Sequence, residues 1–113
     1  MKKWFAASVL ATVSLVANAE NYATCILDKM PGSVNEAFTG SVYSECAAAY
    51  PSTGYSILKG SGRGLFGFKD GNACVQKKSK DTPNQRAAMM IAFACRCLYN
   101  QATFEEEMCA YRP

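Results

Sequence analysis

Residues 74–99 read CVQKKSKDTPNQRAAMMIAFACRCLY, and their pattern also occurs in residues 25–50, CILDKMPGSVNEAFTGSVYSECAAAY. The two stretches align without a gap and share two cysteines, an asparagine and a tyrosine: Cys25, Asn35, Cys46 and Tyr50 and, 49 positions later, Cys74, Asn84, Cys95 and Tyr99. Repeated cysteines around a repeated helix-start signal indicate two like units, each closed by its own disulfide. We therefore predict tandem helical-hairpin repeats at residues 20–51 and 72–100.

Each unit has a capping-box pattern ahead of its long apolar segment. Ser33 is followed three positions later by Glu36, and Thr82 by Gln85. In a capping box these side chains satisfy free backbone amides at a helix start, so we predict Ser33 and Thr82 as helix caps. Apolar residues at helical spacing then predict one core-facing stripe in each helix: Val34, Phe38, Val42, Cys46 and Tyr50 in the first and Ala87, Ile91, Cys95 and Tyr99 in the second.

Helix geometry allows the two cysteines of each unit to meet. The helix from Ser33 to Cys46 rises roughly 20 Å, and a short helix followed by an extended segment from Cys25 returns about the same distance. Six cysteines allow about fifteen pairings. The repeat selects two of the three bonds and elimination supplies the third: Cys25–Cys46, Cys74–Cys95 and Cys97–Cys109.

Two segments lie outside the repeat. Thr103 and Glu106 form a third capping-box pattern, which predicts a helix over residues 103–110. Between the units, the glycines of residues 52–72 predict a Gly-rich loop or weak hairpin over the helices, and residues 69–72 a turn. Four apolar residues of this loop either form a contact surface for a partner or cover the core: Tyr55, Leu65, Phe66 and Phe68.

The first nineteen residues have the pattern of a secretory signal peptide. Two lysines precede an apolar run, and residues 17–19 read Ala-Asn-Ala. The run is shorter than the roughly 20 residues that span a membrane. We expect residues 20–113 to form a single disulfide-stabilised helical domain, periplasmic or secreted. Its ten basic and nine acidic residues indicate no nucleic-acid partner.

The residue types needed for common catalytic and metal sites are missing from the sequence. The chain has no histidine, which removes the commonest general base and a principal zinc ligand. Gly62–Gly67 matches the letters of a dinucleotide-binding motif, but the chain lacks room for the βαβ unit that the motif requires. Cys95 and Cys97 lie on opposite sides of a helix, so we expect structural disulfides there and no cofactor, metal or enzyme activity.

The second unit also resembles a known group. Its residues Cys74-Val75-Gln76-Lys77-Lys78, Lys80-Asp81-Thr82, Ala87-Ala88, Ile91, Ala94-Cys95 and Leu98-Tyr99 are similar to a motif of small exported proteobacterial proteins of uncharacterised function. The resemblance implies export but no activity and no functional residues. We expect a non-enzymatic binding protein with an unknown protein partner in the cell envelope or outside the cell. The alternatives are a thiol-disulfide redox protein using Cys95 and Cys97, and a secreted toxin or inhibitor of an envelope enzyme.

Overall fold

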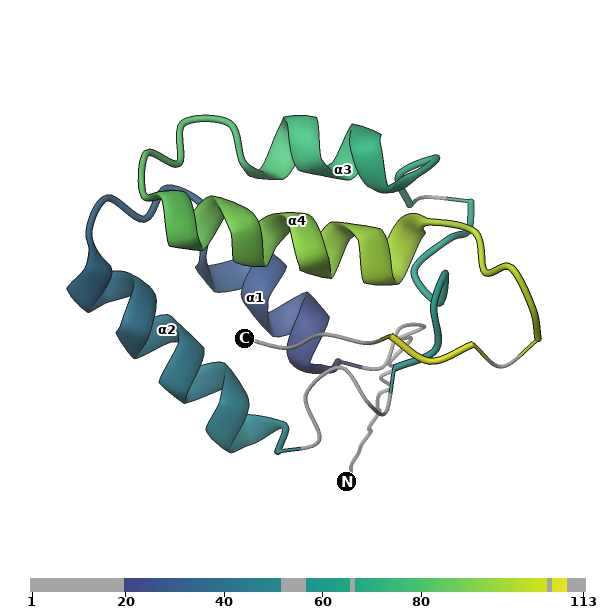
Figure 1. The fold of residues 1–113 in the computed structure, drawn as a ribbon, viewed down its shortest axis with the longest axis horizontal. Helices are drawn as coiled ribbons and strands as arrows, with labels where there is room; N and C mark the ends of the chain where they lie inside the picture. The colour runs from purple at the N-terminus through teal and green to yellow at the C-terminus, as the bar shows by residue number, and fades with distance from the viewer. Residues whose placement is uncertain (1–19, 52–56, 66, 106, 110–113) are drawn as a thin grey trace, which may run out of the picture.

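The computed structural model describes residues 20–51, 57–65, 67–105 and 107–109. The expected signal peptide, residues 1–19, lies outside these residues. The described chain forms four α-helices: α1 (Tyr22–Lys29), α2 (Glu36–Ala49), α3 (Gly71–Lys78) and α4 (Gln85–Tyr99) (Figure 1). Its β-structure is limited to one isolated bridge. The predicted mainly helical class is confirmed.

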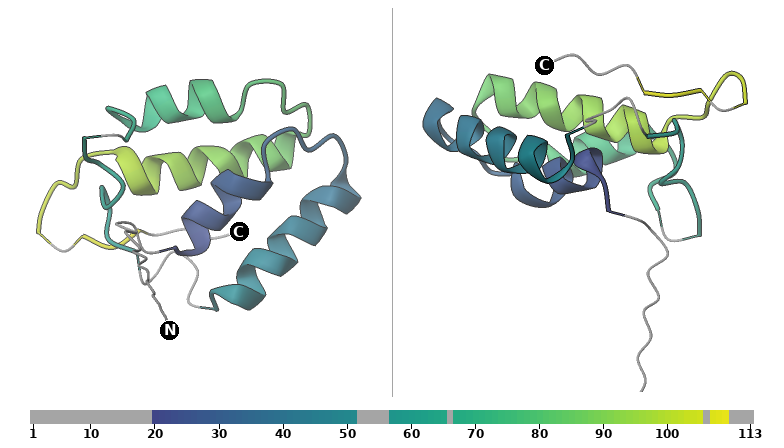
Figure 2. Two further views of the ribbon diagram at one scale, coloured as in Figure 1. Left: turned by 180° about the vertical axis from the view of Figure 1, so that it is seen from behind. Right: turned by 90° about the horizontal axis from the view of Figure 1, so that it is seen from below.

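The four helices pack in the order α3, α4, α1, α2, with α4 at the centre and the short α3 at one edge (Figure 1). Figure 2 shows the same order from behind. One continuous core lies between the helices, and it includes Ile57 and Cys109 from the connecting segments. Its completely buried members include Ile26, Met30, Ile91, Cys46, Cys74 and Cys95.

The predicted cap residues of α2 and α4 are wrong by two positions. Asn35 caps α2, where its side-chain oxygen accepts a hydrogen bond from the backbone N–H of Phe38 at 2.8 Å. Asn84 caps α4 in the same way, with the N–H of Ala87 at 2.8 Å. Asparagine is at least as good a cap as serine or threonine. The helices therefore begin later than the capping-box pattern predicts.

The hydroxyl residues instead join the two helix starts to each other. Thr82 Oγ1 accepts a hydrogen bond from the N–H of Gly32 at 2.8 Å. The buried Ser33 hydroxyl lies 2.7 Å from the hydroxyl of Thr39, which in turn donates to Asn84 Oδ1 at 3.0 Å. This network links the loop before α2 to the loop before α4.

The predicted core stripe is confirmed for three of its four residues in α4, where Tyr99 is half-buried, and only partly in α2. Ala87, Ile91 and Cys95 are completely buried. In the first unit Val42 and Cys46 are buried, whereas Phe38 and Val34 are exposed. Because α2 lies at the edge of the row, only one of its sides meets another helix.

Two local predictions fail in the connecting segments. The turn predicted at residues 69–72 contains the start of α3, where Asp70 caps the helix by accepting the N–H of Ala73 at 2.8 Å. The helix predicted over residues 103–110 is absent from the described residues 103–105 and 107–109. Residues 107–109 instead pair with residues 57–59 in an antiparallel bridge, Leu58 opposite Met108. The hydrogen bonds of an isolated bridge and the third disulfide hold this segment extended.

Candidate functional site

The disulfides fix the framework of the molecule. They join Cys25 to Cys46, Cys74 to Cys95 and Cys97 to Cys109, with Cα–Cα distances of 5.8, 5.4 and 5.5 Å. These distances lie in the usual range for disulfides, and the pairs are the predicted ones. Cys95 and Cys97 bond to partners on different elements, so the two do not form a disulfide with each other. No cysteine in the described residues is free.

The predicted contact surface is not assembled within the described residues. Tyr55 and Phe66 lie outside them. Leu65 is 90% exposed, whereas Phe68 is half-buried and packs edge-to-face on Tyr99 with ring centroids 5.2 Å apart. Phe68 therefore covers the core, and Leu65 projects into solvent.

The Gly-rich loop supplies hydrogen-bond donors to the backbone carbonyl groups at the C-terminal end of α4. The backbone N–H groups of Gly60 and Gly62 donate to the carbonyls of Cys97 and Leu98, each at 2.8 Å. The guanidinium of Arg63 donates to the Tyr99 carbonyl at 2.8 Å. The last carbonyls of a helix have no partner within the helix, and a cation there also interacts favourably with the helix dipole. Within the glycine motif, the Gly62 amide thus binds a helix end and the Gly67 amide donates to the Gly64 carbonyl at 3.3 Å, which argues against their use for phosphate.

One hollow in the described structure extends across α1. It has a volume of about 520 Å³ and is lined from all four helices and from both flanks of α1. Buried Leu27 and Leu98 and the half-buried Cys25 provide apolar surface within it. Charged and phenolic side chains complete the lining: Glu20, Asp28, Lys29, Glu45, Lys78, Tyr50 and Tyr99.

Part of the charge around this hollow is already paired. Lys29 Nζ lies 3.2 Å from Glu45 Oε2, and the Tyr50 hydroxyl donates to Glu20 Oε1 at 3.1 Å. Asp28 and Lys78 form no salt bridge within the described part of the chain. The hollow therefore presents one carboxylate and one ammonium group that a ligand can reach.

Both tyrosines of the hollow act as hydroxyl groups at neutral pH. Burial, followed by the hydrogen bond and the negative charge of Glu20, raises the pKa of Tyr50. Burial also raises the pKa of Tyr99. Both phenols stay protonated, so Tyr50 continues to donate to Glu20 and Tyr99 can donate a hydrogen bond to a ligand.

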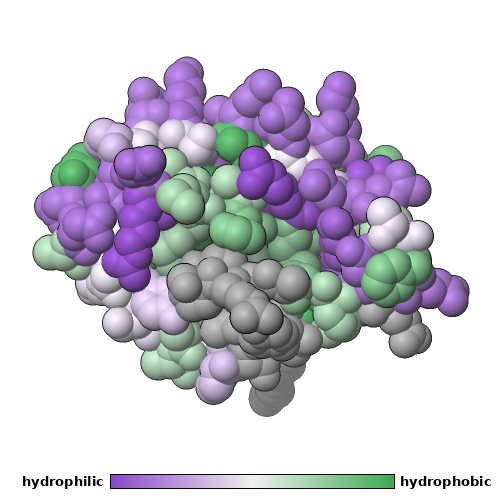
Figure 3. Space-filling view, viewed as in Figure 1, coloured by the Kyte–Doolittle hydropathy of each residue, from purple (hydrophilic) through white to green (hydrophobic). Residues whose placement is uncertain are grey.

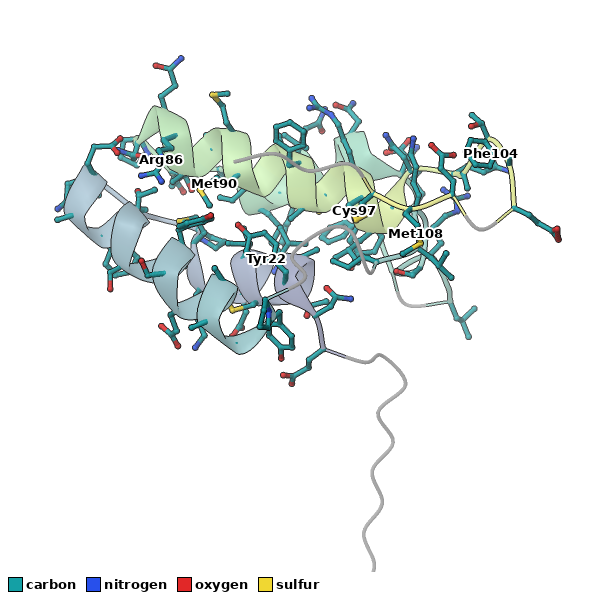
Figure 4. All side chains as sticks on the ribbon, turned by 60° about the horizontal axis from the view of Figure 1, so that its bottom comes forward. Tyr22, Arg86, Met90, Cys97, Phe104 and Met108 are labelled. Carbon is teal, nitrogen blue, oxygen red and sulfur yellow. A yellow bond between two sulfur atoms is a disulfide. The ribbon has the colours of Figure 1, made fainter. Side chains whose placement is uncertain are left out.

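A smaller hollow of about 210 Å³ lies where the C-terminal segment crosses α4. Cys97 and Met108 both line it and lie close together in Figure 4. Lys59 and Glu107 pair at 3.5 Å at its edge. Within the residues that the structure describes, no group of three or more acidic, cysteine or histidine side chains could hold a metal ion.

The sequence interpretation missed the charges around the hollow and a wider charge pattern. Tyr50 and Tyr99 occupied the predicted core stripe, yet each is only half-buried and lines the hollow. The charged residues are also unevenly distributed along the chain. Residues 20–51 carry one basic and four acidic residues, whereas residues 57–100 carry eight basic and two acidic ones. The nearly neutral total hid this separation.

Comparison with known proteins gives no match to a family model, a curated protein or a solved structure. Among the described residues, none of the helices has the length and apolar character required to cross a membrane. Three disulfides in so small a chain are consistent with an oxidising, extracellular environment.

Proposed function

We propose that this protein is an exported, non-enzymatic binding protein that takes its ligand in the hollow across α1. Export into the periplasm or out of the cell is supported by the signal-peptide pattern of residues 1–19 and by the three disulfides. The observation that carries the binding role is the hollow itself, whose volume of about 520 Å³ is within the usual range for ligand sites.

The lining favours a short peptide or another ligand with charges of both signs. Leu27 and Leu98 provide apolar contact, while Asp28 and Lys78 are available for a cationic and an anionic group. The Cys25–Cys46 disulfide joins the two helices on one side of the hollow, so this wall is held before the ligand binds. A preorganised site binds more tightly because less conformational freedom is lost.

Ala49 and Ala48 provide a matched test of this site. Both are exposed on α2, but only Ala49 lines the hollow. We expect a random peptide library displayed on phage to yield binders to the exported protein. Ala49→Trp should abolish their binding because the indole ring fills the hollow, whereas Ala48→Trp should bind like the parent. Both variants should melt at the parent temperature.

Two outcomes would contradict the proposal. The first is a library that yields no binder even when each phage displays many peptide copies. The second is a set of binders that Ala49→Trp and Ala48→Trp affect equally. The selected peptides could instead resemble segments of an envelope enzyme. If this protein then inhibits that enzyme, the inhibitor alternative is favoured within the same site.

The redox alternative has less support. Cys95 is completely buried and bonded to Cys74, while Cys97 is bonded to Cys109. A redox pair of Cys95 and Cys97 would require both structural disulfides to open. Reactive cysteines are usually accessible to their substrates.

We also propose that the two helix pairs are duplicated units joined by the Gly-rich loop, as the sequence repeat predicts. A separation of 49 positions recurs throughout the two pairs. It separates the first residues of α1 and α3, those of α2 and α4, and the first cysteines of the Cys25–Cys46 and Cys74–Cys95 disulfides. The positive φ angles of Gly32 and Asp81 have the same separation.

A further inference from the structure

The outer edge of the molecule at α3 is basic. Lys69 precedes the helix, Lys77 and Lys78 lie in its last turn, and Lys80 follows it. In the described residues none of these lysines is in a salt bridge. Figure 3 shows hydrophilic side chains along this edge, over α3.

The acidic side chains nearby reduce this positive charge only in part. Asp70 uses its carboxylate to cap α3, and Asp81 lies in the turn beyond Lys80. The acidic unit containing α1 and α2 extends toward the opposite end of the row (Figure 1). An anionic surface would therefore attract the α3 edge and repel the α2 edge, so the charge distribution determines one orientation.

An apolar loop tip adjoins the same edge. Arg63 donates a hydrogen bond to the Lys69 carbonyl at 3.0 Å, which brings together two basic residues that lie on either side of Leu65 in the chain segment here called the Leu65 loop. Leu65 lies within this loop and is 90% exposed, more than any other large apolar side chain in the described chain. In the right-hand view of Figure 2, the chain on either side of residue 66 extends away from the helices.

We propose that the α3 edge and the Leu65 loop dock on an anionic lipid surface. The lysines would lie over the headgroup phosphates while Leu65 enters the acyl boundary. Clusters of about four or more basic residues beside an apolar anchor are typical of such binding. The ammonium group of lysine is a point charge on a flexible chain, which suits contact with many lipid phosphates. Arginine is preferred where one phosphate or carboxylate is bound through two hydrogen bonds.

Vesicle sedimentation tests this proposal with the protein purified from the exported fraction. Binding to phosphatidylglycerol–phosphatidylcholine vesicles should exceed binding to pure phosphatidylcholine vesicles and should weaken as salt is raised. The triple variant Lys69→Gln, Lys77→Gln and Lys80→Gln should lower the partition coefficient for anionic vesicles by about tenfold or more. Leu65→Ser should lower it by several-fold.

Val34→Ser is the matched control for Leu65→Ser, because Val34 is also exposed but lies before α2. It should bind vesicles like the parent. Equal binding to neutral and anionic vesicles, or no loss with the lysine variant, would overturn the proposal. Failure of the peptide-binding test would leave this result intact, since Ala49→Trp should not alter vesicle binding.

Discussion

At the scale of single residues, the helix starts depend on a choice between two good caps. Both Ser33 and Asn35 could cap α2, and both Thr82 and Asn84 could cap α4. The structure uses the asparagines because the hydroxyl groups have other partners: Thr82 accepts from Gly32 of the other unit, and the Ser33 hydroxyl lies 2.7 Å from that of Thr39. Local sequence cannot reveal the partner of Thr82, which lies 50 positions away.

Removal of either asparagine cap should destabilise the domain. Asn35→Ala should lower the free energy of unfolding by about 1 kcal/mol, the usual effect of losing a cap. Asn84→Ala should cost more, because the Asn84 side chain also accepts from Thr39 and donates to Glu36 at 3.0 Å. Urea denaturation measures both changes. The control is Asn72→Ala, which should be nearly neutral because the exposed Asn72 caps no helix. Parent-like stability of Asn35→Ala would contradict the assignment of Asn35 as the cap of α2.

At the scale of elements, the Gly-rich loop and α4 depend on each other. A Cβ atom at Gly62 would lie 2.9 Å from Tyr99 Cε1 and 3.0 Å from Leu98 Cβ, too close to be accommodated without movement. At Gly64 a Cβ atom would meet nothing within 4 Å. The sequence showed many glycines, but only the packing distinguishes those that contact α4 from those that do not.

Gly62→Ala and Gly64→Ala should therefore differ sharply. The first should cost about 1–3 kcal/mol, since overpacking either displaces Tyr99 or breaks the hydrogen bond from Gly62 to Leu98. The second should leave the melting temperature within about a degree of the parent. Circular dichroism at 222 nm would follow both melts. Equal melting temperatures would show that the loop does not rest on α4 in solution.

The C-terminal segment should add an acid-sensitive contribution to stability. Hydrogen bonds from the backbone N–H of Thr103 at 2.7 Å and from its hydroxyl at 2.9 Å lower the pKa of Glu107, and Lys59 lowers it further against an opposing effect of burial. Because the folded-state pKa is below the unfolded one, the carboxylate stabilises the fold at neutral pH. This stabilisation is lost as the pH falls below the usual glutamate pKa of about 4.3 and through the folded value.

Glu107→Gln measures this contribution. The variant should melt below the parent at pH 7, and the two melting temperatures should converge as the solution is acidified. Glu105→Gln serves as the control, because Glu105 is exposed and makes none of these contacts. A difference that persists unchanged at low pH would assign the effect to packing and not to charge.

The 49-residue repeat predicted the helical class, the four helix positions to within a few residues, and two of the three disulfides, while the third followed by elimination. It failed where tertiary contacts compete with a local pattern. The capping box at Thr103 does not start a helix, because the Glu107 carboxylate takes the Thr103 amide while the Cys97–Cys109 bond and the pairing with Ile57 keep the segment extended. The hollow could not be predicted, since its lining comes from four helices.

At the scale of the whole molecule, the two helix pairs share one core. α4 packs on α3 of its own unit and on α1 of the other, and Ile26 and Ile91 belong to the same buried cluster. Neither unit buries its apolar face alone. The shared core therefore joins the two helix pairs into one packed structure.

Unfolding should consequently occur in a single cooperative transition for both units. In urea, helical circular dichroism and the near-ultraviolet tyrosine signal should give the same midpoint. Ile26→Ala in α1 should destabilise the domain by about 2–5 kcal/mol, because it removes a completely buried side chain. The same shift should appear in hydrogen exchange at amides of α4, whose slowest-exchanging groups report global opening. If α4 kept its parent protection in the variant, the second unit would be stable without the first and the shared core would not determine the fold.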